Sequence, residues 1–137
     1  MEKVIHYCWF GGKPLPKLAK KCIKSWKKYL PDYEIKEWNE KNFDINMCPF
    51  VKGAYENKKW AFVADYARMY ALYNEGGIYF DTDMEIINNV DFLKEKDVFI
   101  GYEENKFTLV LLDTAFPHEG ILVGNRLYLG ADRKSVV

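Results

Sequence analysis

The sequence predicts an α/β fold, in which helices cover a mainly parallel sheet. Three observations predict it: a short apolar segment at 4–10, an amphipathic helical pattern at 17–30 and an alternating pattern at 33–38. A strand, a helix and a second strand in this order form a parallel crossover. The chain has 137 residues, 49% of them hydrophobic, so it is long and apolar enough for one globular core.

The charge balance excludes some classes of function. Lys and Arg together number 20, and Asp and Glu together number 20, so no excess of positive charge indicates nucleic-acid binding.

No signal-peptide pattern precedes the first apolar segment, and no apolar window reaches the length of a membrane span. We therefore expect a cytoplasmic chain. The three cysteines form no Cys-x-x-Cys pair and are expected to be free thiols.

The first strand is predicted at 4–10, because this short apolar run ends at Gly11-Gly12. His6 within it is expected to be a hydrogen-bonded core residue. The first helix is predicted at 17–30, with apolar residues at four-residue spacing: Leu18, Cys22 and Trp26. Its lysines are expected to form a solvated face.

The middle of the chain predicts a second strand and a long helix. The strand at 33–38 alternates in polarity, and 39–57 is expected to be a loop with short helical pieces. The segment 58–75 contains no Gly or Pro and is apolar on nearly every side, so we expect a buried helix. Gly76 is expected to end this helix in the left-handed conformation.

A short strand is predicted at 78–80, and it leads directly into Asp81-Thr82-Asp83. Weaker patterns after it predict a short edge strand at 84–87, a helical turn at 91–94 and strands at 98–102 and 109–112. Residues 132–137, with Ala131 before them, match the in-frame translation of a common DNA-sequencing adapter. We therefore expect this tail to be artefactual and the natural protein to be longer.

Two charged residues interrupt the apolar helix. Asp65 and Arg68 are three residues apart and therefore share a face of the helix. Charges in a buried helix are costly unless they are paired or bound to a ligand. The pattern is compatible with an internal ion pair or with a polar edge that contacts a ligand.

The acidic triplet at the end of the third strand is the main candidate site. If strand geometry continues, Tyr79, Asp81 and Asp83 point to one side, while Phe80 and Thr82 point to the other. Two neighbouring carboxylates repel each other unless a cation lies between them, and oxygen ligands suit Mg²⁺ or Mn²⁺. The plain alternative is an acidic turn in solvent.

The segments 60–68 and 72–83 resemble the sugar-binding region, with its Asp-x-Asp motif, of glycosyltransferase family 32. That family includes capsular-polysaccharide glycosyltransferases and outer-chain mannosyltransferases, and the same segments are similar to the catalytic core of glucosylating bacterial toxins. The opening 5–12 resembles the first strand of this group. The resemblance covers about 3–104. It implies a GT-A fold (the Rossmann-like nucleotide-diphospho-sugar transferase fold), incomplete at the C-terminus.

This resemblance implies a domain organisation and an activity. Residues 1–104 would form the nucleotide-sugar-binding core, and 105–137 an uncertain continuation that includes the tail. The activity would be retaining, metal-dependent transfer of a hexose from a UDP- or GDP-hexose to a glycan acceptor, in surface polysaccharide or glycan biosynthesis. A lipid-linked acceptor would bring the protein to the inner face of the membrane.

The resemblance also assigns roles to residues. Asp65 and Arg68 would bind hydroxyls of the donor sugar, and Tyr79 would lie against the donor. Asp81 would contact the ribose and sugar, partly through the metal shell, and Asp83 would ligate Mn²⁺ or Mg²⁺ directly. These two aspartates are the candidate catalytic residues.

Trp9 corresponds to an aromatic residue that stacks on the nucleotide base, although core packing explains it equally well. There are three alternative interpretations of the function. A haloacid-dehalogenase-like phosphatase usually has Gly-Thr after its Asp-x-Asp, where Met84-Glu85 stands here. A calcium loop requires glycine where Ile86 stands. The third alternative is a non-catalytic donor-binding fragment.

Overall fold

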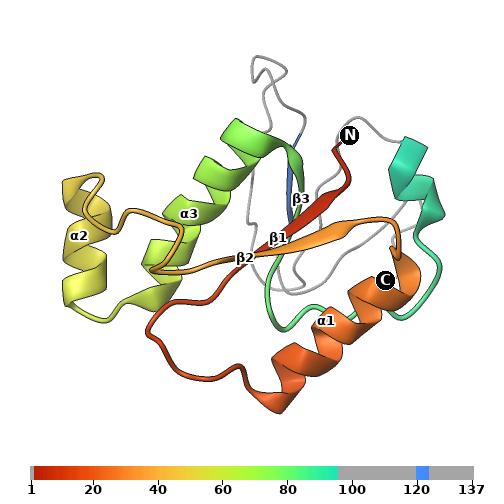
Figure 1. Ribbon diagram of the computed structural model, residues 1–137, viewed down its shortest axis with the longest axis horizontal. Coiled ribbons are helices and arrows are strands. Elements are labelled where there is room, and N and C mark those ends of the chain that lie inside the picture. Colours follow the sequence, from red (N-terminus) through yellow and green to blue (C-terminus); the bar gives the residue numbers. More distant parts are fainter. Residues whose placement is uncertain (1, 96–119, 124–137) are drawn as a thin grey trace, which may run out of the picture.

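This computed structural model of the protein describes residues 2–95 and 120–123. Figure 1 shows how the elements are arranged. In chain order they are β1 (Val4–Cys8), α1 (Lys17–Tyr29), β2 (Glu34–Trp38), α2 (Pro49–Glu56), α3 (Trp60–Glu75), β3 (Gly77–Phe80), the 3-10 helix η1 (Asp91–Glu95) and β4 (Gly120–Val123).

The strands form one parallel sheet in the order β2-β1-β3-β4. Ile5 of β1 is in register with Ile35 of β2 on one side and with Ile78 of β3 on the other. The strand β3 in turn pairs with β4, also in parallel. The predicted α/β class and its parallel crossover are therefore confirmed, whereas the assignment to the GT-A fold stays a prediction.

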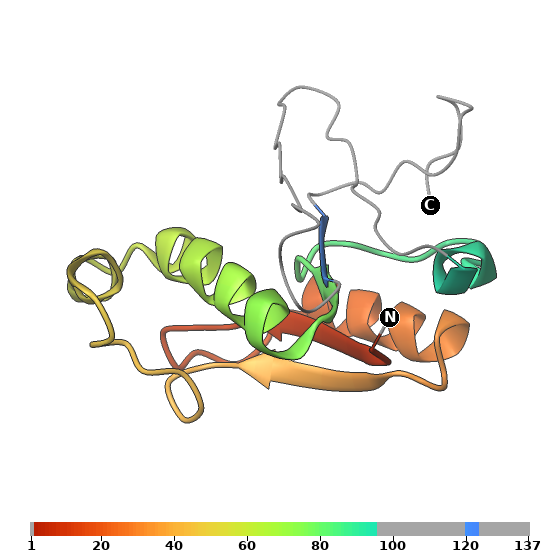
Figure 2. The same ribbon diagram turned by 90° about the horizontal axis from the view of Figure 1, so that it is seen from above.

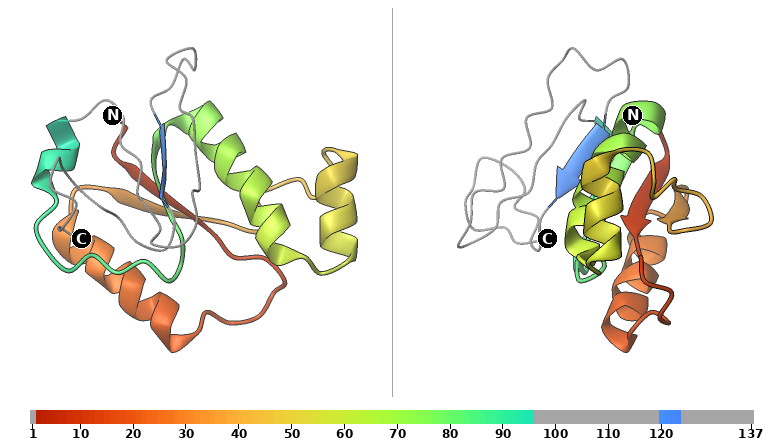
Figure 3. Two further views of the ribbon diagram at one scale, coloured as in Figure 1. Left: turned by 180° about the vertical axis from the view of Figure 1, so that it is seen from behind. Right: turned by 90° about the vertical axis from the view of Figure 1, so that its left-hand side faces the viewer.

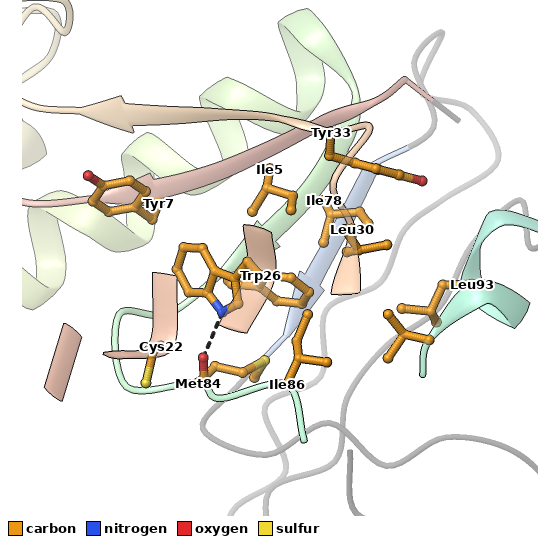
Figure 4. Packing of buried hydrophobic residues seen from close by; sticks show 12 residues of the cluster. Ile5, Tyr7, Cys22, Trp26, Leu30, Tyr33, Ile78, Met84, Ile86 and Leu93 are labelled. Carbon is orange, nitrogen blue, oxygen red and sulfur yellow. Dashed lines mark hydrogen bonds between the residues drawn. The ribbon is translucent and has the colours of Figure 1, made fainter. Parts of the chain in front are cut away.

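Alternate side chains of the central strands enter two different apolar clusters. Ile5, Ile78 and Phe80 pack in the cluster that contains Trp26 of α1, which Figure 4 shows from close by. Tyr79 packs in the other cluster, with the small residues of α3. Because neighbouring residues of a strand point to opposite faces, α1 and α3 cover opposite faces of β3. Figure 2 shows both helices beside the strands.

His6 is a fully buried link between three parts of the fold. Trp38 donates its indole N–H to Nδ1 of His6 over 3.0 Å, so Nε2 carries the proton and donates to the carbonyl of Gly76 over 2.8 Å. Burial lowers the pKa of His6 and keeps the ring neutral. The prediction of a hydrogen-bonded core histidine is confirmed.

The turn from α3 into β3 depends on two glycines. Gly76 has φ of 65° but ψ of −156°, so it ends the helix with positive φ, and the predicted left-handed helical cap is wrong in ψ. Gly77 has φ of 88°, and a Cβ atom there would lie 2.5 Å from the carbonyl oxygen of Val4. This close approach lets β3 enter the sheet beside β1.

The prediction of an edge strand at 84–87 is wrong. Residues 84–87 are irregular instead of an edge strand, because α1 takes up part of their backbone hydrogen bonding. Trp26 donates to the carbonyl of Met84 over 2.7 Å, and the hydroxyl of Ser25 accepts the N–H of Ile86 over 2.9 Å.

The helix α3 is not buried all round. Its buried face consists of small and aliphatic residues, whereas Phe62 is 51% exposed and Met69 37% exposed. The turn at 91–94 is confirmed as η1, and α2 is a helical piece within 39–57. The strands predicted at 98–102 and 109–112 and the tail at 132–137 lie outside the described residues.

The lysines of α1 lie on its exposed side, as predicted. The cysteines in the described ranges are free thiols. Among the helices described, none combines the length and apolar character needed to cross a membrane. Figure 3 shows the same arrangement from behind and from the side.

Candidate functional site

The candidate site is a pocket at the carboxyl ends of β1 and β3. These strands are parallel neighbours, so their carboxyl ends lie at the same edge of the sheet, where α/β proteins commonly bind ligands. The pocket has a volume of about 480 Å³. It is lined by Cys8, Trp9, Phe10, Lys13, Trp60, Ala61, Ala64, Arg68, Tyr79, Asp81, Thr82 and Asp83.

The acidic triplet reaches this pocket through a turn. The carbonyl of Asp81 accepts the N–H of Met84 over 3.0 Å, and regular strand geometry ends at Phe80. The predicted alternation therefore fails after Asp81, and Thr82 lines the same pocket as its two neighbours. Asp81 and Asp83 both line this pocket.

Arg68 is the central charged group of the site. One nitrogen of its guanidinium, Nη2, lies 2.9 Å from Oδ1 of Asp65 and 3.4 Å from Oδ1 of Asp81. The Arg68 side chain is 12% exposed, and its guanidinium carbon lies 4.9 Å from the ring centroid of Tyr79. The two interpretations of the Asp65–Arg68 pair are therefore compatible, because the ion pair exists and Arg68 also lines the pocket.

The surroundings of Asp81 shift the pKa of its carboxyl group. Burial raises its pKa to about 6, with a further increase from Asp83 and Asp65, whereas the Arg68 guanidinium acts in the opposite direction. Like-charge repulsion among these carboxylates favours a protonated Asp81 at low pH. A cation beside Asp81 and Asp83 would relieve the same repulsion and favour the ionised form.

Of the other predicted site residues, Tyr79 and Trp9 line the pocket, whereas Asp65 does not. Tyr79 is buried under the pocket and lies beneath Arg68. Trp9 lines the pocket and donates its indole N–H to the carbonyl of Lys13 over 2.6 Å, but it also packs against the core cluster around Trp26. Asp65 does not line the pocket, since its half-exposed side chain reaches the site only through Arg68.

Several pocket residues were not predicted from the sequence. Lys13 follows Gly11-Gly12, and its place in a Gly-rich loop after the first strand was the available signal. Trp60 closes the pocket against this loop, and a Cβ atom at Gly11 would lie 2.8 Å from its ring. Cys8 also lines the pocket, and burial raises the pKa of its thiol to about 12, so it is not a nucleophile there.

The donor set fits a divalent cation that keeps open coordination positions. Within residues 2–95 and 120–123, no group of three or more His, Cys, Asp or Glu side chains could hold a metal ion. Among the described residues, Asp81 and Asp83 line one pocket and could supply carboxylate oxygens to such a cation, with water and phosphate at other positions, as at many Mg²⁺ sites. Glu85 is not part of such a set, because it pairs with Lys21 over 3.1 Å, which argues against a calcium loop.

The fold and the pocket define the protein as an α/β protein that carries two aspartates at the carboxyl edge of a parallel sheet, where such proteins commonly bind ligands. In a comparison with known families, residues 16–100 match the family described as glycosyltransferase sugar-binding region containing DXD motif. The match covers more than half of the chain, so the protein belongs to this family of glycosyltransferases and is a transferase. No curated protein and no solved structure matches the chain.

Proposed function

We propose that residues 1–104 form the donor-binding part of a metal-dependent GT-A glycosyltransferase. The observation that supports it most directly is the pocket that Asp81, Asp83 and Arg68 line at the carboxyl ends of β1 and β3. The donor is a nucleoside diphosphate hexose, with uridine or guanosine as the nucleoside. A glycan accepts the hexose with retention of configuration, in surface polysaccharide or glycan biosynthesis.

The two aspartates have different roles in this proposal. Asp83 is exposed and ligates Mn²⁺ or Mg²⁺ directly, whereas Asp81 is largely buried and held near Arg68. Asp81 contacts the donor and completes the metal shell. When bound, the cation supplies positive charge to the departing diphosphate.

Arg68, Asp65 and Tyr79 orient the donor. The ion pair with Asp65 holds the guanidinium in place before the donor binds, and the Tyr79 ring supports it from below. A guanidinium fixed in this way hydrogen-bonds sugar hydroxyls without losing much side-chain entropy. It fixes the sugar ring in the orientation in which the acceptor attacks the anomeric carbon. Trp9 stacks on the nucleotide base at the edge of the same pocket.

The chemistry of the sugar carbon sets a further demand on the site. Breaking the bond between sugar and diphosphate gives the ring oxocarbenium character, as in glycoside hydrolysis. In this proposal, the negative charge of an ionised Asp81 stabilises this centre, and the support is that Asp81 lines the same pocket as Arg68. A lipid-linked glycan acceptor would bring this cytoplasmic protein to the inner face of the membrane.

The substitution Asp83→Ala tests the metal role. We expect the affinity for the nucleotide sugar to become independent of Mn²⁺, since the direct ligand is lost. Titration calorimetry of a panel of nucleotide sugars, with Mn²⁺ or EDTA, measures this. The matched control is Glu56→Ala, an exposed acidic residue at the end of α2 that lies outside the pocket. An Asp83→Ala variant with unchanged metal-dependent affinity would remove the proposed role.

A further inference from the structure

A second cavity adjoins the proposed donor pocket. It has a volume of about 490 Å³, and it shares Trp9 and Lys13 with the pocket that contains Asp81 and Asp83. Its other lining residues are Gly11, Gly12, Glu37, Asn39, Glu40, Lys41 and Tyr55. Trp9 and Lys13 therefore line both cavities, and a ligand that occupies both cavities would contact these two residues.

The loop that carries Lys13 is held in a defined shape. The backbone N–H of Trp9 donates to the carbonyl of Trp38 over 2.9 Å, and its indole N–H donates to the carbonyl of Lys13 over 2.6 Å. The N–H of Gly11 donates to Oε1 of Glu40 over 2.5 Å. These bonds fix the backbone on both sides of the turn at Gly11-Gly12, so the position of Lys13 is set by the fold.

Arg68 and Lys13 both line the Asp81–Asp83 pocket, but they differ in their ion-pair partners. Arg68 is already bound by Asp65 and Asp81, and Glu40 accepts from Gly11 and from the hydroxyl of Tyr55. In the part of the chain that the structure describes, Lys13 is the one cation of the Asp81–Asp83 pocket with no ion pair. Its ammonium is therefore available to an anionic ligand.

We infer that Lys13 binds the diphosphate of the donor at the junction of the two cavities. The inference rests on the proposed function and adds a contact that does not depend on the metal. An ammonium is a compact point charge suited to phosphate oxygens, and charge-assisted hydrogen bonds are about twice as strong as neutral ones. In this proposal, Lys13 and a cation held by Asp81 and Asp83 would both offset the negative charge of the diphosphate.

The test compares Lys13→Ala and Lys13→Arg with the control Lys20→Ala, an exposed lysine of α1 that lines neither cavity. Calorimetry on the 137-residue chain measures the affinities for UDP, GDP and the corresponding nucleosides, with EDTA and with Mn²⁺. We expect Lys13→Ala to weaken the diphosphate by about tenfold or more, in EDTA as well as in Mn²⁺, and to leave nucleoside affinity unchanged. Lys13→Arg should retain most of the diphosphate affinity.

Two results would overturn the inference. One is an unchanged diphosphate affinity in Lys13→Ala, and the other is an equal loss for nucleoside and diphosphate, which would indicate a disturbed loop. If Asp83→Ala loses metal dependence while Lys13→Ala binds as the wild type does, only this inference fails. If the wild-type chain binds no nucleotide or nucleotide sugar at all, the proposed function fails with it.

Discussion

At the residue scale, Asp81 and Asp83 show how environment separates two identical side chains. Asp81 is 24% exposed, lies 3.4 Å from Arg68 and has its pKa raised to about 6. Asp83 is exposed at the turn. The sequence predicted that both would face one site, but it could not predict their difference, because that depends on Arg68 from another element.

Arg68→Ala tests whether this residue is a ligand contact or only an ion-pair partner. We expect the nucleotide sugar to lose more affinity than the free nucleotide, since the guanidinium contacts sugar hydroxyls in our proposal. Binding measurements with UDP-glucose or GDP-mannose against UDP or GDP provide the comparison. Lys36→Ala is the control, because Lys36 also forms a partly buried ion pair, with Glu75, outside the pocket. An equal loss for both ligands would place Arg68 in a purely structural role.

At the scale of elements, α3 and β3 explain where sequence patterns succeed and fail. The strand β3 and its acidic end were predictable, because an apolar run between Gly-Gly and Asp-x-Asp is a strong local signal. The prediction that α3 is buried on nearly every side is wrong, because the helix packs against the sheet through one face of small residues, which includes Val63, Ala67 and Ala71. Large apolar residues on its other side, among them Phe62, are exposed in the described structure.

Gly77→Ala tests the junction between these two elements. An alanine there would need positive φ and would place its Cβ against Val4, so we expect a loss of stability of about 2 kcal/mol or more. Gly53→Ala is the matched control, since a Cβ in α2 at that position meets nothing within 4 Å and should stabilise by about 0.5 kcal/mol. Urea denaturation measures both. A Gly77→Ala variant as stable as the wild type would contradict the close approach of β3 to β1.

At the scale of the whole molecule, the topology brings the site together. Parallel pairing of β1 with β3 places the loop after β1, which carries Trp9 and Lys13, beside the turn that carries Asp81 and Asp83. The sequence predicted the parallel class from the order of local patterns. It did not predict the strand order or β4, because pairing between distant segments leaves no local periodicity.

The central claim is that the carboxylates at the end of β3 hold a divalent ion together with the diphosphate of the donor. Phosphorus NMR of bound UDP or GDP during a Mn²⁺ titration tests it most directly, because the paramagnetic ion broadens only nearby phosphorus signals. The account predicts that both diphosphate signals broaden more strongly with the wild type than in a protein-free sample with the same Mn²⁺, and that Asp83→Ala removes this excess broadening. Nucleotide that binds with sharp phosphorus signals in the presence of bound Mn²⁺ would contradict it.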